Sequence, residues 1–206
     1  MITVYGRATS SNVQIVMWAI AELGLKHERL DYGHSYGGND TPEYLAMNPN
    51  GLVPTFRDGD LVMWESSAIL RYLGAQYGDE AFWPRDPAVR GPLDMWAEWS
   101  KTTLSPGFNY AIFLPMVRTP RSQRDMAAID RGIEALKPVM RRLDARLGAG
   151  PYLAGEALSF ADMLTGNLLY RYYTTDFDKV ETPALDAYYA RLKALPNYAE
   201  HVMVSY

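Results

Sequence analysis

The sequence predicts two domains, an α/β domain over residues 1–79 and an all-helical domain over residues 88–206. Short runs of β-forming residues alternate with amphipathic helical patterns only in the first part of the chain. Residues 78–87 contain two prolines, one glycine and three acids, and are typical of a linker. Beyond this linker the apolar residues follow helical spacing, and no strand is predicted.

The elements of the first domain follow from its local patterns. Ser11 and Gln14 fit a capping box at the start of the first helix. Asp58-Gly59 favours a type I′ hairpin turn between two strands. The expected strands cover residues 2–5, 28–31, 53–56 and 61–64, and the expected helices cover 13–23, 42–48 and a segment from 65 to 77.

The second domain has the more regular pattern. Apolar residues between 122 and 147 alternate in steps of three and four, so one long helix is expected, with Pro138 kinking or splitting it. An earlier helix is expected to be interrupted at Pro106-Gly107. Ser159 and Asp162 form a second capping box, and a last helix over 184–195 is expected to stop at Pro196.

Composition excludes several classes of function. The 206 residues carry 20 Lys and Arg against 24 Asp and Glu, a net charge of −4, so we expect no nucleic-acid partner. The chain has no cysteine, which excludes disulfides and any reaction that uses a thiol of the protein itself. The three histidines are scattered, so no metal site is expected.

The sequence shows no targeting signal and no long apolar run. The apolar residues 1–5 are followed at once by polar ones, and no stretch approaches about 18 consecutive apolar residues, the length needed to cross a membrane. We therefore expect a cytoplasmic protein that does not engage a membrane.

Three junctions between loops and regular elements could carry chemistry. Thr9, Ser10, Ser11 and Asn12 precede the first helix, where hydroxyl and free N–H groups favour an anion, although plain helix capping is the commoner role of such residues. Val53-Pro54 begins a strand, so the backbone of Val53 could pair with an extended ligand, or Pro54 could simply mark an edge strand.

The third junction is Glu65-Ser66. The carboxylate of Glu65 suits an ammonium group, and the N–H groups at the helix start suit a carboxylate, so together they match the head of an α-amino acid. The alternative is a first-turn Glu that stabilises the helix dipole.

The order of these junctions resembles that of the cytosolic glutathione S-transferases, over essentially the whole chain. The family's motifs appear here as Ser10-Ser11-Asn12-Val13, Asn48-Pro49-Asn50-Gly51-Leu52-Val53-Pro54, Trp64-Glu65-Ser66-Ser67-Ala68-Ile69 and Ser159-Phe160-Ala161-Asp162. Val117-Arg118-Thr119-Pro120 makes the chain most similar to a bacterial serine-type branch. Leu52 departs from the family, in which Lys or Gln is common at this position.

The resemblance implies a thioredoxin-like domain that binds glutathione as co-substrate, without a metal, and a helical domain that contributes the electrophile pocket. It implies that Ser10 donates a hydrogen bond to the glutathione sulfur. Val53 would pair with the cysteinyl unit, and Pro54 would follow a cis peptide bond. The other glutathione-binding residues that it implies are Asn12, Asn39 near the glycyl carboxylate, and Glu65 and Ser66 at the γ-glutamyl group.

The expected reaction is attack of the glutathione thiolate on a small electrophile, in a detoxifying homodimer. We expect Phe113 and Met116 to line the electrophile pocket. Arg118, and with it Arg7, could orient anionic electrophiles such as haloacids, whereas a solvated arginine at a helix end is the alternative for Arg118. Two other functions stay open: a non-catalytic binding module, and an isomerase or dehalogenase that uses glutathione as a true cofactor.

Overall fold

The computed structural model describes all 206 residues and divides into two compact units. The first unit contains residues 1–83 together with residues 194–206, and the second contains residues 84–193. The expected helical domain over 88–206 is therefore wrong at its C-terminal end. The reason is a packing contact within the first unit, where the ring of Tyr198 lies edge-on to Trp18 at 4.9 Å between centroids and both side chains are buried.

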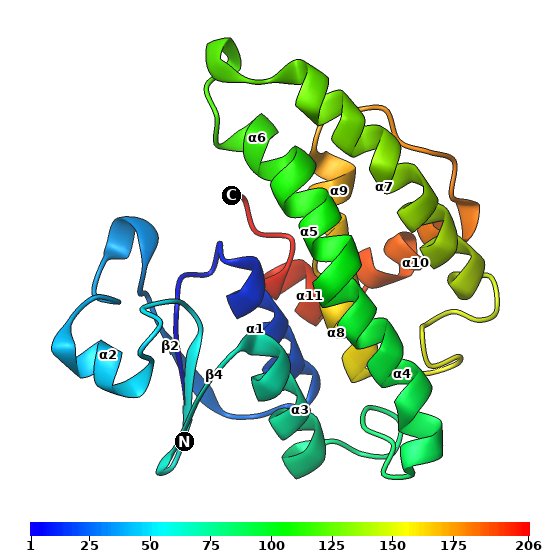
Figure 1. Cartoon of the computed structure of the whole chain (residues 1–206). Coiled ribbons are helices and arrows are strands. Elements are labelled where there is room, and N and C mark those ends of the chain that lie inside the picture. Colours follow the sequence, from blue (N-terminus) through cyan, green and yellow to red (C-terminus); the bar gives the residue numbers. More distant parts are fainter. The chain divides into compact units, whose positions relative to one another are not determined.

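A four-stranded mixed sheet forms the centre of the first unit, in the order β2-β1-β3-β4. β1 pairs parallel with β2 and antiparallel with β3, which forms a hairpin with β4. Helices α1 and α3 pack against each other on one side of the sheet, and α2 lies on the other side (Figure 1). The elements are β1 (Ile2–Tyr5), α1 (Ser11–Glu22), β2 (His27–Leu30), a 3₁₀ turn (His34–Tyr36), α2 (Pro42–Met47), β3 (Thr55–Asp58), β4 (Leu61–Trp64), α3 (Ser66–Tyr77) and α11 (Pro196–His201).

The hairpin turn differs from the expected type. Asp58 pairs with Leu61, so Gly59 and Asp60 are the two central residues. Only Gly59 has a positive φ, of 59°, whereas a type I′ turn needs a positive φ at both central residues. The sequence pattern identified the hairpin correctly but placed its turn one residue too early.

In the second unit, residues 87–117 form one continuous helical rod, labelled α4 to α6 in Figure 1. The expected break at Pro106-Gly107 is absent. Pro106 lies inside this rod, and the π turns that precede and follow its segment give the helix the local change of hydrogen-bond register that accommodates a residue without an N–H group. The rod consists of α4 (Pro87–Trp99), a π turn (Ser100–Leu104), α5 (Ser105–Phe108), a π turn (Asn109–Phe113) and α6 (Leu114–Val117).

The long helix α7 (Met126–Leu147) packs against this rod, and Pro138 does not split it. The capping box of Ser159 and Asp162 is confirmed at the start of α8. The remaining elements of the unit are a 3₁₀ turn (Arg121–Gln123), α8 (Phe160–Gly166), α9 (Leu169–Thr174) and α10 (Pro183–Lys193).

Candidate functional site

The predicted junctions of the first unit meet at the N-terminus of α1. A Cβ atom added to Gly6, just after β1, would lie 2.5 Å from Cγ2 of Val13 and 3.1 Å from Cβ of Val53. Only glycine fits such a close approach of strand, helix and loop. Gly6 therefore allows the first turn of α1 to lie against the segment that carries Val53.

Ser10 occupies the N-cap position of α1, with extended backbone angles (φ −84°, ψ 122°). Ser10 is 8% exposed, and its side chain makes no capping hydrogen bond. The expected capping box of Ser11 and Gln14 is wrong, because Ser10 and not Ser11 occupies the N-cap position. The amide of Gln14 instead donates to the carbonyl of Ala8 at 3.1 Å. The Ser10 hydroxyl thus lies at the positive end of the helix without serving as its cap.

A hydrogen bond joins the first and third junctions. The hydroxyl of Ser66, the first residue of α3, donates to Oδ1 of Asn12 in the first turn of α1 at 3.2 Å. The two residues are 54 positions apart in the chain. This bond joins the first turn of α1 to the start of α3.

The peptide bond between Val53 and Pro54 is cis, as the resemblance implied. Residues 50–55 are held by buried side chains from α2 and its end. The hydroxyl of Tyr44 donates to the carbonyl of Leu52 at 2.7 Å, and the amide of Asn48 donates to the same carbonyl at 2.8 Å. Thr55 donates to Tyr44 at 2.9 Å and accepts from Asn48 at 3.1 Å, and burial raises the pKa of Tyr44.

Asn39 and Arg7 lie next to this segment. The Asn39 amide donates to the carbonyl of Gly51 at 2.5 Å. A Cβ atom added to Gly33 would lie 3.3 Å from Val53, 3.5 Å from Nη1 of Arg7 and 3.8 Å from Cγ of Asn39. Arg7 was expected at the electrophile, but the structure groups its guanidinium with Asn39 and Val53, because the turn after β1 runs past Gly33.

Glu65 has a strained backbone, with φ 70° and ψ 108°. A non-glycine residue in this region costs about 1–3 kcal/mol, and such residues cluster at functional sites. The Glu65 carboxylate is exposed and makes no capping hydrogen bond to α3. Glu65 therefore lies at the N-cap position without capping the helix through its side chain, and its exposed carboxylate stands at the helix start.

The residues expected at the electrophile all belong to the second unit apart from Arg7. Phe113 is 1% exposed, with its ring against Phe108 and with the guanidinium of Arg171 at 4.9 Å from its centroid. It belongs to the core, so the expectation that it lines an open pocket is wrong. Met116 is half-buried and lines a cavity of about 350 Å³, and Arg118 is the exposed C-cap residue that follows α6.

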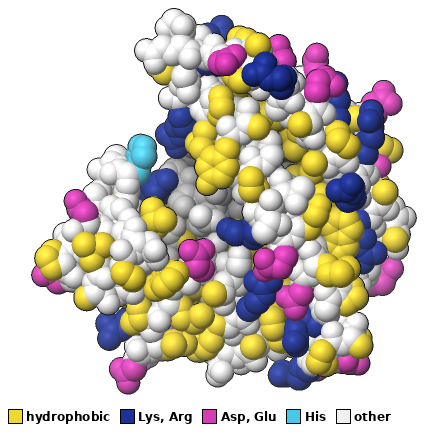
Figure 2. Space-filling view, in the orientation of Figure 1, with side chains coloured by type: hydrophobic (Ala, Val, Ile, Leu, Met, Phe, Trp, Pro, Cys, Tyr) yellow, Lys and Arg dark blue, Asp and Glu magenta, His cyan; other side chains and the backbone are white.

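The surface carries no single-sign patch on the face shown in Figure 2, where Lys and Arg alternate with Asp and Glu. No group of three or more His, Asp or Glu side chains is placed to hold a metal ion. None of the helices is both long and apolar enough to cross a membrane.

Comparison with known proteins identifies the family. Residues 1–75 match the glutathione S-transferase N-terminal domain, and residues 104–196 match the C-terminal domain. The chain is 37% identical to glutathione S-transferase GstB of Escherichia coli, over 99% of each chain. The chain belongs to the glutathione S-transferase family.

Solved structures of this family agree with the fold. The theta-class glutathione S-transferase of Xanthomonas axonopodis with glutathione bound is 41% identical, with a TM-score of 0.93 over 99% of this chain and 98% of that one. Glutathione S-transferase I from maize in complex with an atrazine glutathione conjugate is 27% identical, with a TM-score of 0.88 over 98% and 97%. The thioredoxin-like domain and the helical domain are thereby confirmed, and the chain is an enzyme of the transferase class.

Sequence reasoning missed the hydrogen bonds that position the family's Val-Pro segment. Tyr44, Asn48 and Thr55 surround the carbonyl of Leu52, and all three are buried. Asn48 was recognised only as part of a motif. A signal was present, because a buried Asn before Pro-Asn-Gly must find partners for its amide, and the nearest unpaired backbone groups are those of the following loop.

Proposed function

We propose that this enzyme transfers the thiolate of glutathione to a small electrophile, with Ser10 donating a hydrogen bond to the sulfur. The observation that carries this proposal is the Ser10 hydroxyl, which lies at the start of α1 and is not used to cap it. Glutathione is the bound ligand of the Xanthomonas relative, and a glutathione conjugate is the ligand of the maize relative. These two bound ligands support glutathione and an electrophile as the substrates.

The chemistry needs a thiolate at neutral pH. A free thiol has a pKa of about 8.5, so only a few per cent is ionised. A hydroxyl donor and the positive end of a helix both stabilise the anion, and each unit by which the thiol pKa falls corresponds to about 1.4 kcal/mol. The thiolate then attacks an electrophilic carbon held next to it, and proximity supplies much of the rate. A chain without cysteine can catalyse this reaction because the co-substrate brings the nucleophile.

The remaining residues of the first unit would hold glutathione in an extended form. The free backbone groups of Val53, before cis-Pro54, pair with the cysteinyl unit. Glu65 accepts hydrogen bonds from the γ-glutamyl ammonium group, and Ser66 with the N-terminus of α3 binds the γ-glutamyl carboxylate. Asn12 orients Ser66 through the hydrogen bond between them.

Arg7 and Asn39 would serve the glycyl end. Their closeness to Gly33 and Val53 supports a guanidinium that binds the glycyl carboxylate, where Leu52 offers no polar group. Asn39 is a positioning residue in this scheme, because its amide already holds the carbonyl of Gly51. Replacing Arg7 by Ala is expected to weaken binding of glutathione more than of γ-glutamylcysteine, which lacks the glycine, and Arg7→Lys is the matched control.

The γ-glutamyl assignment is tested by truncation of the other end. Glu65→Ala or Ser66→Ala should weaken binding of glutathione, with less effect on cysteinylglycine, which lacks the γ-glutamyl group. Isothermal titration with both thiols measures this. Equal losses for the two thiols would contradict the assigned roles.

Turnover on a broad panel of electrophiles tests the proposed function itself. Glutathione should be consumed in a one-to-one ratio with the electrophile, as measured by loss of free thiol and by mass spectrometry of the conjugate. Turnover without net consumption of glutathione would instead identify an isomerase or dehalogenase. Glutathione binding without turnover on the whole panel would identify a binding module.

The electrophile class is proposed from Arg118. Its guanidinium is exposed just beyond α6 and suits a carboxylate. We expect the enzyme to prefer small haloacids to neutral haloarenes. Arg118→Ala should lower kcat/KM for a haloacid and leave kcat/KM for a haloarene nearly unchanged. An equal change for both substrates would show that Arg118 is a solvated arginine at a helix end and does not orient the electrophile.

The same proposal includes assembly, location and role. Leu45 and Leu52 are 38% and 65% exposed and flank Gly51, an apolar patch that a second copy of the chain could cover in a homodimer. The cytoplasm keeps thiols reduced, which conjugation requires, and removal of reactive electrophiles would be a detoxifying role. Light scattering on the purified protein tests the dimer, and cell fractionation tests the location.

A further inference from the structure

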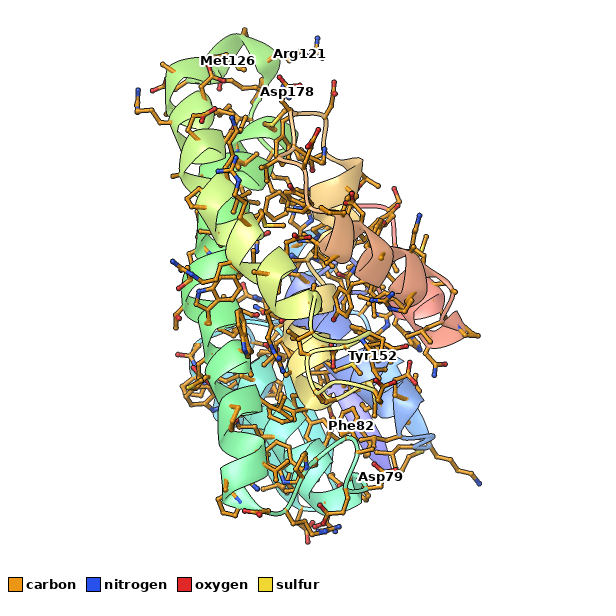
Figure 3. All side chains as sticks on the ribbon, turned by 90° about the vertical axis from the view of Figure 1, so that its right-hand side faces the viewer. Asp79, Phe82, Arg121, Met126, Tyr152 and Asp178 are labelled. Carbon is orange, nitrogen blue, oxygen red and sulfur yellow. The ribbon has the colours of Figure 1, made fainter.

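The helical unit contains a cavity of about 350 Å³ that belongs to none of the predicted glutathione residues. It opens between the end of α6, the first three turns of α7 and the segment that follows α9. Figure 3 labels Met126 and Asp178, which lie at the same end of this unit and both line the cavity. Its volume is in the range of small-molecule sites.

One side of the cavity is apolar and adaptable. The lining includes the side chains of Met116, Met126, Ile129, Ile133 and Phe177. Methionine side chains are flexible and polarisable, and they serve binding surfaces that accept ligands of varied shape. Phe177 is fixed behind them, because its ring packs on Tyr172 at 5.5 Å between centroids, and the ammonium group of Lys179 lies 4.3 Å from its centroid.

The other side of the cavity is acidic. Four carboxylates and one ammonium group line it, a net charge of −3, from Asp130, Glu134, Asp176, Asp178 and Lys137. Lys137 is paired with Glu134 at 2.5 Å, and the ammonium group of Lys179 interacts electrostatically with Asp176 and Asp178. Lys179 balances at most one of the three aspartate charges, so the lining keeps a net negative charge. Lys179, from the same segment, donates to the carbonyls of Thr175 and Phe177, and its ammonium group lies over the face of the Phe177 ring.

We propose that this cavity binds an amphipathic organic cation. The apolar body of the ligand would lie against Met116, Met126 and Phe177, and its ammonium group would face Asp130, Asp176 and Asp178. The carboxylates are not grouped closely enough to hold a metal ion, so their charge suits a larger and more weakly hydrated cation. The proposal concerns residues of the helical unit alone and does not depend on the transferase mechanism.

The two methionines make the site directly observable. With methionine methyl groups labelled with carbon-13, the signals of Met116 and Met126 can be assigned from Met116→Leu and Met126→Leu. Titration with 4-phenylbutylammonium should shift both signals to saturation, while the exposed Met1 and the buried Met163 stay in place. The affinities for the neutral analogue 4-phenylbutanol and the anion 4-phenylbutyrate should be lower by roughly ten-fold or more, because these molecules lack the attraction to the aspartates.

Charge removal separates the proposal from a simple apolar crevice. The triple variant Asp130→Asn, Asp176→Asn and Asp178→Asn changes only exposed side chains and should bring the affinity for the cation down to that for the alcohol. Glu156→Gln, an exposed acid of the same unit outside the cavity, is the matched control and should change nothing. The proposal is overturned if cation and alcohol bind equally to the unmodified enzyme, if neither shifts the two signals, or if the triple variant keeps the full affinity.

Discussion

The two units use their polar groups in different ways. In the N-terminal unit, buried polar side chains hold a loop, as Tyr44, Asn48 and Thr55 do around residues 50–55. In the helical unit, the buried carboxylate of Asp162 accepts hydrogen bonds from the core, and the open cavity is lined on one side by methionine and other apolar side chains and on the other by charged ones. The N-terminal unit therefore fixes one loop geometry for one co-substrate, whereas the helical unit lines part of its cavity with flexible side chains that can adapt to a ligand.

The largest expected effect is on the polar centre of the helical unit. Asp162 accepts hydrogen bonds from the backbone N–H groups of Leu153 and Ser159 and from the hydroxyls of Ser159 and Tyr188, at 2.8–3.0 Å. Asp162→Ala leaves these donors buried without a partner and should lower the free energy of unfolding by about 3–5 kcal/mol. Urea denaturation measures the loss.

Asp144→Ala is the control for this prediction. Asp144 accepts one hydrogen bond, from the N–H of Leu185 at 2.9 Å, at a partly buried position. Its loss should cost about 1 kcal/mol. Equal losses for the two variants would show that Asp162 is not the anchor of the unit.

The corresponding change in the N-terminal unit is Asn48→Ala. It removes the amide that holds the carbonyl of Leu52 and the hydroxyl of Thr55, and should lower the free energy of unfolding by about 2–3 kcal/mol. Unlike Asp162→Ala, it should also weaken glutathione binding directly, by roughly ten-fold, because Val53 follows a carbonyl that Tyr44 alone would then hold. Asn50→Ala loses only a partly buried hydrogen bond to Asn48 and should leave glutathione binding unchanged. If Asn50→Ala lost as much glutathione affinity as Asn48→Ala, the effect could not be assigned to the amide of Asn48.

A smaller effect is expected from the strained backbone of Glu65. At φ 70° a glycine is unstrained, so Glu65→Gly should be more stable than Glu65→Ala by about 1 kcal/mol in thermal or urea unfolding. Both variants should lose glutathione affinity, since both lack the carboxylate. Equal stability of the two would show that the backbone relaxes and that no strain is stored at this junction.

The smallest effect concerns the C-terminal segment that packs on the first unit. Burial lowers the pKa of His201 below its ordinary 6.5, and Glu200, His27, Arg29 and Glu22 are the charged groups around it. Because the unfolded state binds the proton more readily, stability from this group is present above about pH 6.5 and is lost as the pH falls through that value.

His201→Gln should make the stability of the C-terminal segment less dependent on pH below about 6.5. The measurement is hydrogen exchange of residues 196–201 between pH 7.5 and 5.5, with His27→Gln as the control at the exposed neighbouring ring. A profile that His201→Gln leaves unchanged would assign the pH dependence to another group.

Much of the fold could be predicted because it depends on local patterns. The strand at residues 2–5, the hairpin around Gly59 and the capping box at Ser159 are each encoded by a few adjacent residues. The packing of Tyr198 on Trp18 could not be predicted, because no local pattern indicates which distant helix an aromatic ring will contact. The unbroken rod through Pro106 was missed because π turns have no clear sequence signature.

The site shows the same division. The cis peptide bond at Pro54 and the helix start at Ser66 came from motifs, and the structure confirms both. Phe113 was assigned to a pocket but belongs to the core, because residue type alone does not tell a lining side chain from a core one. The position of Arg7 beside Gly33 was not predicted. The positions of Asn39 and Gly33 beside Arg7 depend on how the loop after β2 folds back, which is a tertiary property.

The central claim is that Ser10 lowers the pKa of the glutathione thiol, and titration of the bound thiol tests it most directly. The ultraviolet absorbance of the thiolate, followed against pH in the binary complex, gives that pKa, and steady-state kinetics give kcat/KM on the same proteins. Ser10→Ala should raise the thiol pKa toward its free value of about 8.5 and lower kcat/KM by a factor equivalent to about 1–3 kcal/mol, with a smaller change in glutathione affinity. A Ser10→Ala enzyme that keeps its thiol pKa and full kcat/KM, while Ser11→Ala or Asn12→Ala loses them, would contradict the account.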